Sequence, residues 1–290
     1  MKEAPGNLFD VTGRIYAITG AAGALCGTMA VDLAARGARV ALLDIDLEAA
    51  ERRAQLIRDA GGEALTLRCN VLDEGEIEAA ADEIERRWGV PHVLINGAGG
   101  NHPSGSTTEV AASAALLGTG PESQTDGRTT FFDLPVEGFE RVFDLNFLGT
   151  VLPSRILGRR MAVRGSGVIL NMSSMSAITP LTKVGAYSAA KGAVANITKW
   201  LAVHLAPAGI RVNALAPGFF MTEQLRFLHI DRTTGEPTAR AKAVMSHTPM
   251  ARYGEPEELV GAVIWLTTDA SSFVTGVLLP IDGGFSAYTI

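Results

Sequence analysis

The sequence predicts an α/β fold in which one parallel sheet of seven strands is covered by helices on both faces. Short apolar runs alternate with longer amphipathic runs along most of the 290 residues, which is the pattern of consecutive β-α-β units. The turn between the first strand-like run and the first helix-like run is rich in glycine. Right-handed crossovers join such units into a doubly wound parallel sheet, so we expect residues 1–290 to form one domain of this kind.

Seven apolar runs have the length and composition of buried strands. They lie at residues 14–19, 39–43, 64–68, 92–95, 168–170, 210–215 and 277–281. Helical periodicity or alanine-rich composition predicts helices at residues 25–36, 47–60, 74–87, 136–163, 186–205 and 256–268. Two segments break this order, an insertion at about 100–134 with one short alanine- and leucine-rich run, and an irregular loop at about 217–250 with one possible short helix. Long irregular segments in compact domains are usually functional.

Composition and charge disfavour several classes of protein. Hydrophobic residues make up 47% and charged residues 19% of the chain, as in compact globular proteins. The net charge of -6 disfavours nucleic acid and membranes as partners. No signal-like or spanning apolar run is visible, so we expect a cytoplasmic protein. Cys26 and Cys69 are too few for a disulfide framework or a metal site, and we expect both to be reduced packing residues.

The glycine-rich turn, TGAAGALCG at residues 19–27, predicts a dinucleotide site. Glycines between a first strand and a first helix allow the backbone to approach a pyrophosphate, which the helix N-terminus stabilises. An ordinary glycine-rich turn is the alternative, but the position directly after the first strand favours a site of the Rossmann type. The cofactor-binding residues expected here are Gly20, Gly23 and Leu25.

Asp44 ends the second predicted strand, close to the distance of about 20 residues at which dinucleotide-binding folds carry an acidic residue. A carboxylate there accepts hydrogen bonds from the ribose hydroxyl groups and repels a 2′-phosphate. Because neither Leu43 nor Ile45 is basic, the sequence favours NAD(H) over NADP(H). In the alternative interpretation, Asp44 or Asp46 caps the following helix.

Further cofactor-binding residues are expected where other strands end, because ligands of open α/β sheets bind at the carboxyl ends of the strands. They are Asn70, Val71, Asn96, Gly97 and Ala98. Asn146 lies inside the helix predicted for residues 136–163, where asparagine has poor helix propensity. A functional role and a packing compromise are equally compatible with that position.

Tyr187 and Lys191 are one helical turn apart, so their side chains are expected on the same helix face. An ammonium group beside a phenol lowers the tyrosine pKa from about 10, and such a tyrosine can exchange a proton with a carbonyl or alcohol oxygen. Ser174 follows the central strand, where its hydroxyl can hold the same oxygen. Taken alone the pair is weak evidence, because a surface tyrosine beside a solvated lysine has the same spacing.

Taken together, these motifs resemble the short-chain dehydrogenase/reductase family over nearly the whole chain. The matching positions are the glycine-rich turn, Asp44, Asn96-Gly97-Ala98-Gly99, Asn146, Ser174, Tyr187, Lys191, Pro217-Gly218 and Asp282-Gly283-Gly284. The resemblance implies an NAD(H)-dependent oxidoreductase that interconverts an alcohol and a ketone by hydride transfer.

The resemblance implies that Pro217 and Gly218 bind the cofactor, and it also implies roles for the catalytic residues. Tyr187 is the expected acid/base, and Ser174, in preference to Ser173, positions the carbonyl. Lys191 is expected to lower the Tyr187 pKa and to bind the nicotinamide ribose, so that Tyr187 and Lys191 also contact the cofactor. Asn146 is expected to hold a proton-relay water.

Two positions depart from the family pattern. The glycines Gly20, Gly23 and Gly27 are spaced one residue longer than in the usual Gly-x-x-x-Gly-x-Gly turn. Asn70 replaces the family's aspartate after the third strand, although its side-chain oxygen can still accept a hydrogen bond from an adenine amino group.

Three local runs, Asn96–Pro103, Leu25–Met29 and Phe285–Tyr288, resemble one branch of the family. This is the bacterial sugar-acid branch of the D-mannonate oxidoreductase, or fructuronate reductase, type. By this resemblance the reaction is the reversible, NADH-dependent reduction of D-fructuronate to D-mannonate.

A polyhydroxylated acid needs polar side chains near the reacting carbon and a cation for its carboxylate. Asn101 and His102 are expected to bind substrate together with Ser174 and Tyr187, although a role of His102 in packing the insertion is equally compatible. The candidates for binding the carboxylate are Lys183, Arg226 and Arg252. The loop at about 217–250 is expected to act as a lid over the substrate.

Two other functions stay open. A reductase of the same fold could act on another carbonyl, such as a different keto sugar acid or a 3-oxoacyl thioester, but the many charged residues at 217–250 favour a polar substrate. A non-catalytic dinucleotide-binding scaffold would lack Tyr187 or Lys191, and both are present. The family resemblance further implies a homotetramer, assembled through the long helices that flank the central strand and through the C-terminal strand.

Overall fold

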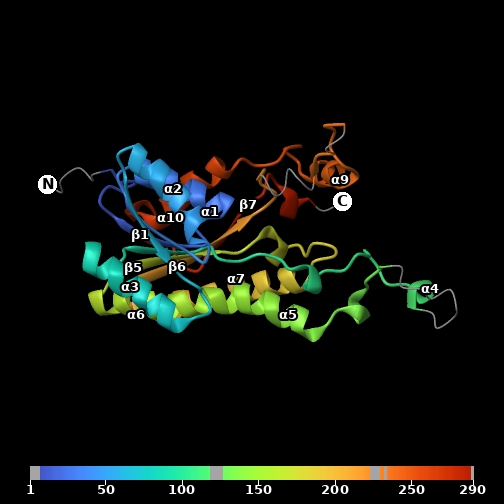
Figure 1. Cartoon of the computed structure of the whole chain (residues 1–290), viewed down its shortest axis with the longest axis horizontal. Helices are drawn as coiled ribbons and strands as arrows, with labels where there is room; N and C mark the ends of the chain where they lie inside the picture. The colour runs from blue at the N-terminus through green and yellow to red at the C-terminus, as the bar shows by residue number, and fades with distance from the viewer. Residues whose placement is uncertain (1–6, 118–126, 223–228, 232–233, 289–290) are drawn as a thin grey trace.

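Seven strands of the described chain form one parallel sheet in the order β3-β2-β1-β4-β5-β6-β7. The computed structural model describes residues 7–117, 127–222, 229–231 and 234–288 (Figure 1). The strands are β1 Ile15–Thr19, β2 Arg39–Asp44, β3 Glu63–Arg68, β4 Val93–Asn96, β5 Gly167–Met172, β6 Ile210–Pro217 and β7 Leu278–Ile281. The predicted doubly wound fold is confirmed, and the strand ends differ from the expected ones by two residues or fewer.

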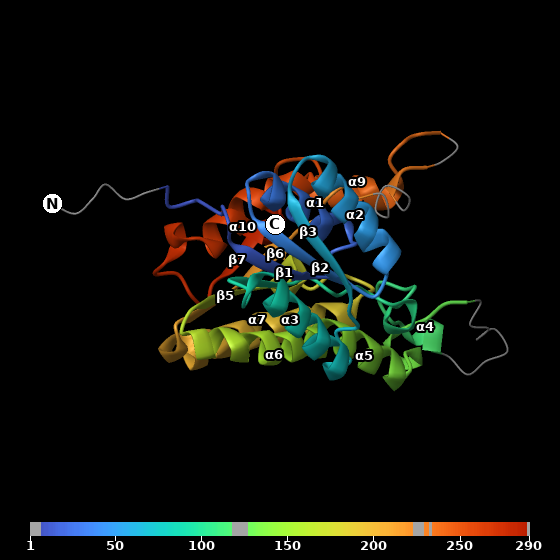
Figure 2. The same cartoon turned by 60° about the vertical axis from the view of Figure 1, so that its left-hand side comes forward.

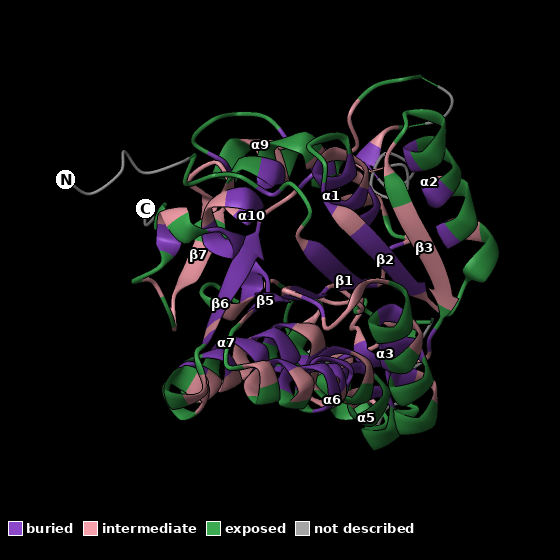
Figure 3. Cartoon of the chain, turned by 90° about the vertical axis from the view of Figure 1, so that its left-hand side faces the viewer, coloured by how far each residue is buried: buried purple, intermediate pink, exposed green. Residues whose placement is uncertain are grey.

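Two layers of helices enclose the sheet (Figures 1 and 2). One layer holds α1 Ala24–Ala35, α2 Leu47–Asp59 and α10 Val260–Thr267, and the other holds α3 Glu74–Trp88, α6 Gly149–Arg164 and α7 Gly185–Leu205. Strand β1 shows why both layers are needed. Tyr16 and Ile18 pack into one buried apolar cluster, whereas Ile15 and Ala17 pack into the other, because successive strand side chains point to opposite faces. Figure 3 shows the resulting buried strands between helices whose outer surfaces are exposed.

The helix predicted for residues 136–163 contains a π-helical turn. It consists of α5 Val136–Phe143, the π-helical segment Asp144–Leu148 and α6. The side chain of Asn146 lies in this turn and donates a hydrogen bond to the Val142 carbonyl oxygen at 2.8 Å. Single π-helical turns inside helices occur frequently at functional sites. This departure from the expected regular helix therefore favours a functional role for Asn146.

The shorter helices lie in the two irregular segments. Helix α4 Ala114–Leu117 belongs to the insertion, and α9 Ala239–His247 is the short helix expected in the loop at 217–250. In Figure 1 both lie towards the same end of the molecule as the C-terminus. Within the described ranges, no helix is both long enough and apolar enough to cross a membrane.

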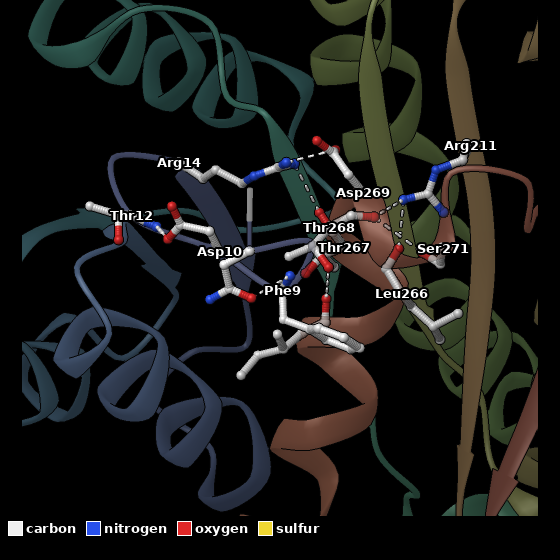
Figure 4. Close-up of polar contacts among 12 residues, drawn as sticks. Phe9, Asp10, Thr12, Arg14, Arg211, Leu266, Thr267, Thr268, Asp269 and Ser271 are labelled. Carbon is white, nitrogen blue, oxygen red and sulfur yellow. Dashed lines mark hydrogen bonds and ion pairs between the residues drawn. The ribbon is translucent and has the colours of Figure 1, made fainter. Parts of the chain in front are cut away.

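Arginines hold the opposite end of the fold together (Figure 4). Arg14 donates hydrogen bonds to the Thr267 carbonyl oxygen at 3.2 Å and to Asp269 Oδ1 at 2.7 Å. Arg211 donates to the carbonyl oxygens of Leu266 and Thr268 at 3.0 and 3.1 Å. These bonds satisfy carbonyl groups that the last turn of α10 leaves unpaired. A cavity of about 580 Å³ opens beside the two arginines, which are engaged by backbone carbonyl oxygens and by the Asp269 carboxylate.

Candidate active site

The sheet order places the turn after β1 beside the turn after β4. Thr19 and Asn96, the last residues of these strands, are paired in register. Gly20 has a φ of +65°, and a Cβ atom there would lie 2.7 Å from the Ala98 nitrogen, so a side chain at this position is excluded. The buried Thr19 Oγ1 accepts hydrogen bonds from the Gly97 and Ala98 nitrogens at 3.0 and 3.2 Å. The sequence analysis did not predict this role of Thr19. A threonine at the end of a buried strand, directly before the glycine-rich turn, was the feature that could have indicated it.

The N-terminus of α1 is open for an anion. Its capping residue Gly23 provides no side-chain hydrogen bond, and its first turn has no acidic residue. By contrast, α2 and α3 are capped by the side chains of Asp46 and Asp73. Unpaired N–H groups at a helix start stabilise a pyrophosphate. Gly20, Gly23 and Leu25 surround this helix start, so the residues present fit a dinucleotide.

Gly27, the third glycine of the turn, has a packing role. A Cβ atom on it would lie 2.7 Å from Nε of Arg53, a side chain of α2 that crosses this part of α1. The longer glycine spacing therefore reflects a contact between α1 and α2.

Asp44 connects the glycine-rich turn to the next helix. Its Oδ2 accepts a hydrogen bond from the Ala22 nitrogen at 2.9 Å, and its Oδ1 accepts one from the Asp46 nitrogen at 3.0 Å. The cap of α2 is Asp46, whose Oδ1 accepts from the Ala49 nitrogen at 2.9 Å. Of the two capping alternatives, only the one for Asp46 is realised. The partly exposed Asp44 carboxylate stays beside the dinucleotide site with acceptor capacity to spare.

The side chain of Asn96 points into the protein, and its expected contact with the cofactor stays a prediction. Asn96 is 1% exposed, and its Nδ2 donates to Ser154 Oγ and Asn171 Oδ1, both at 2.8 Å. Asn171 in turn donates to Thr198 Oγ1 at 2.9 Å. These buried hydrogen bonds join β4 and β5 to α6 and α7 below the site. Any contact between Asn96 and a cofactor must therefore come from its backbone.

The other expected cofactor residues lie at the carboxyl edge of the sheet. Asn70 Oδ1 accepts a hydrogen bond from the Leu72 nitrogen at 3.0 Å, and Val71 is buried against Gly149. Pro217 ends β6, and Gly218 packs so closely on Asp282 that a Cβ atom would lie 2.6 Å from the Asp282 Cβ. The Asp-Gly-Gly ending therefore supports the turn after β6.

Two hydrogen bonds attach α7 to the end of β5. Ser173 Oγ donates to the Lys191 carbonyl oxygen at 2.9 Å, and Lys191 Nζ donates to the Met172 carbonyl oxygen at 2.8 Å. Lys191 is 4% exposed, and its Nζ lies 5.7 Å from the centre of the Tyr187 ring. The two side chains share one helix face, as the spacing predicts. Ser173 is thus a positioning residue, and Ser174 stands next to the tyrosine.

Burial governs the protonation behaviour of this pair. Burial lowers the pKa of Lys191 to about 8. Burial also raises the pKa of Tyr187, and a hydrogen bond with Ser174 opposes that rise. Lys191 is not among the causes of the Tyr187 pKa shift, so the expectation that it lowers this pKa stays a prediction. In the chain by itself burial is the largest cause of the shift, and the ammonium group is bonded to the Met172 carbonyl.

Asn146 and Lys191 meet on either side of Gly99. Asn146 Oδ1 accepts from the Gly100 nitrogen at 3.1 Å, and its Nδ2 donates to the Gly100 carbonyl oxygen at 2.7 Å. A Cβ atom on Gly99 would lie 2.7 Å from Asn146 Oδ1 and 3.0 Å from Lys191 Nζ. The Asn146 carbonyl oxygen accepts from Thr150 Oγ1 at 2.9 Å. Gly99 therefore belongs to the site, and its place in the Asn-Gly-Ala-Gly motif was the available signal.

The expected substrate residues Asn101 and His102 are engaged within the insertion. Asn101 Nδ2 donates to Ser106 Oγ at 2.7 Å. The Nδ1 atom of His102 lies 2.7 Å from Ser104 Oγ, and its Nε2 lies 3.0 Å from Arg141 Nη1. Both ring nitrogens thus have partners, as in the packing alternative. Substrate contact by these two residues stays a prediction.

The three cations expected near a substrate carboxylate have different surroundings. Arg252 donates to both carboxylate oxygens of Glu258, each at 2.7 Å, so its charge is already paired. Lys183 lines a cavity of about 470 Å³ between the segment that precedes α7 and helix α9. Arg226 lies outside the described residues.

Comparisons with known proteins identify the family. The family model for short chain dehydrogenases matches residues 14–232. A Haemophilus influenzae protein named only as an oxidoreductase is 44% identical over 97% of this chain and 95% of its own. The 5-keto-D-gluconate 5-reductase of Escherichia coli is 32% identical over 96% of this chain and 97% of its own. A solved structure from Haemophilus influenzae, described as a candidate D-mannonate oxidoreductase with bound NAD, has a TM-score of 0.89 at 43% identity and covers 97% of both chains.

The chain belongs to the short-chain dehydrogenase family. The enzyme class expected from the sequence, an oxidoreductase that uses a nicotinamide dinucleotide, is confirmed.

Proposed function

We propose that this enzyme interconverts a keto sugar acid and its alcohol with NAD(H), and that the pair is D-fructuronate and D-mannonate. The observation that carries the reaction type is the cluster of Ser174, Tyr187 and Lys191 at the end of β5. The substrate rests on similarity to the Haemophilus influenzae protein described as a candidate D-mannonate oxidoreductase. The relative that reduces 5-keto-D-gluconate supports the wider class of keto sugar acids.

In the direction of reduction, the Tyr187 phenol donates the proton that the ketone oxygen needs. Its raised pKa keeps this proton in place until the substrate takes it. Ser174 Oγ accepts a hydrogen bond from the Ser176 nitrogen at 3.1 Å. Its O–H group, which bonds Tyr187 in the chain by itself, can donate to the same ketone oxygen once a substrate is bound. A bound nicotinamide cofactor supplies the hydride that the ketone carbon takes up. One proton and one hydride together complete the alcohol.

Lys191 supports both the cofactor and the tyrosine in this proposal. One of its three donors is used by the Met172 carbonyl, and two remain for the hydroxyl groups of the nicotinamide ribose. Asn146 holds the loop from β4 in place through Gly100.

The assignment of NAD(H) over NADP(H) depends on Asp44. The carboxylate already accepts bonds from two backbone N–H groups, so its position beside the adenosine half of the site is fixed. A 2′-phosphate on the ribose would meet that charge directly, whereas ribose hydroxyl groups can donate to it.

Initial rates of NADH oxidation would test the proposal against D-fructuronate, D-tagaturonate, 5-keto-D-gluconate and an acetoacetyl thioester, with NADPH in parallel. We expect turnover of D-fructuronate with NADH and at most slow turnover of the thioester. Preference for another keto sugar acid would replace the substrate and keep the class. Preference for the thioester would overturn the class.

We also propose that the enzyme assembles as a homotetramer. The outer faces of α6 and α7 expose Val163, Trp200 and Val203, and β7 is an edge strand of the sheet. Large exposed apolar side chains of this kind are typical of contacts between subunits. Light scattering after size exclusion is expected to give four times the 30.5 kDa chain mass, and a monomer would contradict the assembly.

A further inference from the structure

A cavity of about 470 Å³ opens next to the segment that leads into Tyr187. Its walls come from three places, namely the segment Thr179–Lys183, helix α9, and the aromatic residues Phe219 and Phe285, whose rings are 5.5 Å apart. Phe219 directly follows the Pro217-Gly218 turn, and Lys183 directly precedes Val184, the capping residue of α7. One wall of the cavity is therefore the segment that leads into the helix of the catalytic tyrosine.

The described residues on the walls of this cavity include the basic side chains of Lys183 and Arg240 together with His247. No carboxylate is among the described residues that line it. The chain as a whole has a net charge of -6, so the basic residues described in this cavity give it the opposite sign of charge. Such a site attracts an anion.

The backbone of Lys183 is held in a conformation that favours glycine. Its φ is +69°, and its carbonyl oxygen accepts a hydrogen bond from the Thr107 nitrogen of the insertion at 2.8 Å. A residue with a Cβ atom in the left-handed region costs about 1–2 kcal/mol relative to ordinary backbone. Lysine at this position is therefore less favourable for stability than glycine would be.

Arg240 contributes the second cation from the first turn of α9. None of the ion pairs of the described residues includes Arg240 or Lys183. Arg252, by contrast, is neutralised by Glu258. No carboxylate of the described residues therefore competes with a ligand for Arg240 or Lys183.

We propose that Lys183 and Arg240 together bind the carboxylate of the sugar-acid substrate. This proposal rests on the proposed function, and it adds the residues that distinguish an acid from a neutral polyol. The carboxylate of a keto sugar acid is several carbons away from the ketone that reacts at Tyr187. Because the carboxylate and the ketone are separated in this way, the cations that bind the carboxylate must lie beside the catalytic residues and not among them. Arginine offers a two-pronged contact to a carboxylate, and lysine adds a point charge.

Calorimetric titration of the full-length enzyme, saturated with NAD⁺, would test this assignment with D-gluconate as the charged probe and sorbitol as its neutral counterpart. The variants are Lys183→Gly, which removes the charge and relieves the backbone, and Arg240→Gln. Lys242→Gln is the matched control, since Lys242 is exposed on the same helix and does not line the cavity. We expect each of the two variants to weaken D-gluconate binding about tenfold or more. Sorbitol and NAD⁺ binding should stay unchanged, and the control should match the wild type.

The outcomes separate this assignment from the proposed function. Equal D-gluconate binding by wild type, Lys183→Gly and Arg240→Gln would overturn the carboxylate site, even if the enzyme reduces D-fructuronate. If the two variants lost sorbitol binding as much as D-gluconate binding, the carboxylate site would also be overturned. Lys183 and Arg240 would then affect the shape of the cavity and would not distinguish a charged ligand from a neutral one. Selective loss of D-gluconate binding would support the site whichever keto sugar acid proves to be the substrate.

Discussion

Lys191 Nζ donates a hydrogen bond to the Met172 carbonyl oxygen at 2.8 Å, so the buried ammonium group is fixed to the last residue of β5. The helix that carries Tyr187 is thereby attached to the central strand of the sheet, next to Ser174. The cost of this arrangement is visible in the pKa of Lys191, which burial lowers to about 8.

The first prediction concerns the dependence of stability on pH. Below pH 8 Lys191 is charged in both the folded and the unfolded chain. Between about 8 and the unfolded pKa of 10.5, the unfolded lysine holds its proton and the folded one has lost it, so raising the pH favours the folded state through this group. In urea unfolding at pH 7.5 and pH 10, the wild type should gain up to about 3 kcal/mol relative to Lys191→Met. A constant difference between the two proteins would contradict the lowered pKa.

Tyr187→Phe removes the proton donor and leaves the ring that packs on the site. We expect turnover to fall by about 10²–10⁴-fold, while the affinity for NADH, measured by fluorescence titration, changes little. Tyr16→Phe is the control, because the Tyr16 hydroxyl lies 3.0 Å from Thr267 Oγ1, on the other side of the core. That variant should lose stability and keep its activity. Full activity of Tyr187→Phe would remove this tyrosine from the mechanism.

Thr19→Val replaces the hydroxyl that accepts hydrogen bonds from the Gly97 and Ala98 nitrogens with a methyl group of similar size. Two N–H groups at the sheet edge then lose their acceptor, and we expect a loss of about 1–3 kcal/mol of stability together with weaker NADH binding. Thr19→Ser keeps the acceptor, so it should retain NADH binding. Equal NADH affinity of all three proteins would show that this contact does not shape the site.

Gly99→Ala places a methyl group between Asn146 and Lys191, at 2.7 and 3.0 Å from their polar atoms. Displacement of these groups by a fraction of an ångström should lower kcat by roughly 10–100-fold. Gly192→Ala is the matched control, since its added Cβ atom would meet nothing within 4 Å. It should keep full activity and gain about 0.5–1 kcal/mol of stability, because alanine favours the helix over glycine. Similar kcat values for both variants would argue against close packing at Gly99.

Asp44→Ser removes the negative charge beside the adenosine half of the site. The ratio of kcat/KM for NADH to that for NADPH should fall about tenfold or more, since a bond from a neutral donor to a charged acceptor contributes about 1.5–3 kcal/mol. Asp46→Ser keeps a helix cap next to Asp44 and should leave the ratio unchanged. The ratio is the informative quantity, because the loss of the bond to Ala22 can weaken both cofactors alike. An unchanged ratio in Asp44→Ser would place cofactor choice elsewhere.

Much of this architecture was predictable from local pattern. Strands such as Ile15–Thr19 are wholly buried apolar runs, and a run that must be buried on both faces can only be a central strand between two helical layers. The one-turn spacing of Tyr187 and Lys191 determines a shared helix face, and the structure confirms it. What the pattern could not predict was the direction of the Tyr187 pKa shift, because burial depends on everything packed around the phenol.

The sequence by itself determined the class of enzyme, since the order of apolar runs and the short motifs at their ends specify both the sheet and the residues along its carboxyl edge. Only the tertiary structure decided which of those residues face the site. Asn96 turned inward because two polar partners, Ser154 and Asn171, are buried beneath it. Lys183 and Arg240, far apart in sequence, came to line one cavity because α9 folds back over the segment before α7. Spacing along the chain predicts which neighbours share a face, whereas contact between distant segments depends on how the whole core packs.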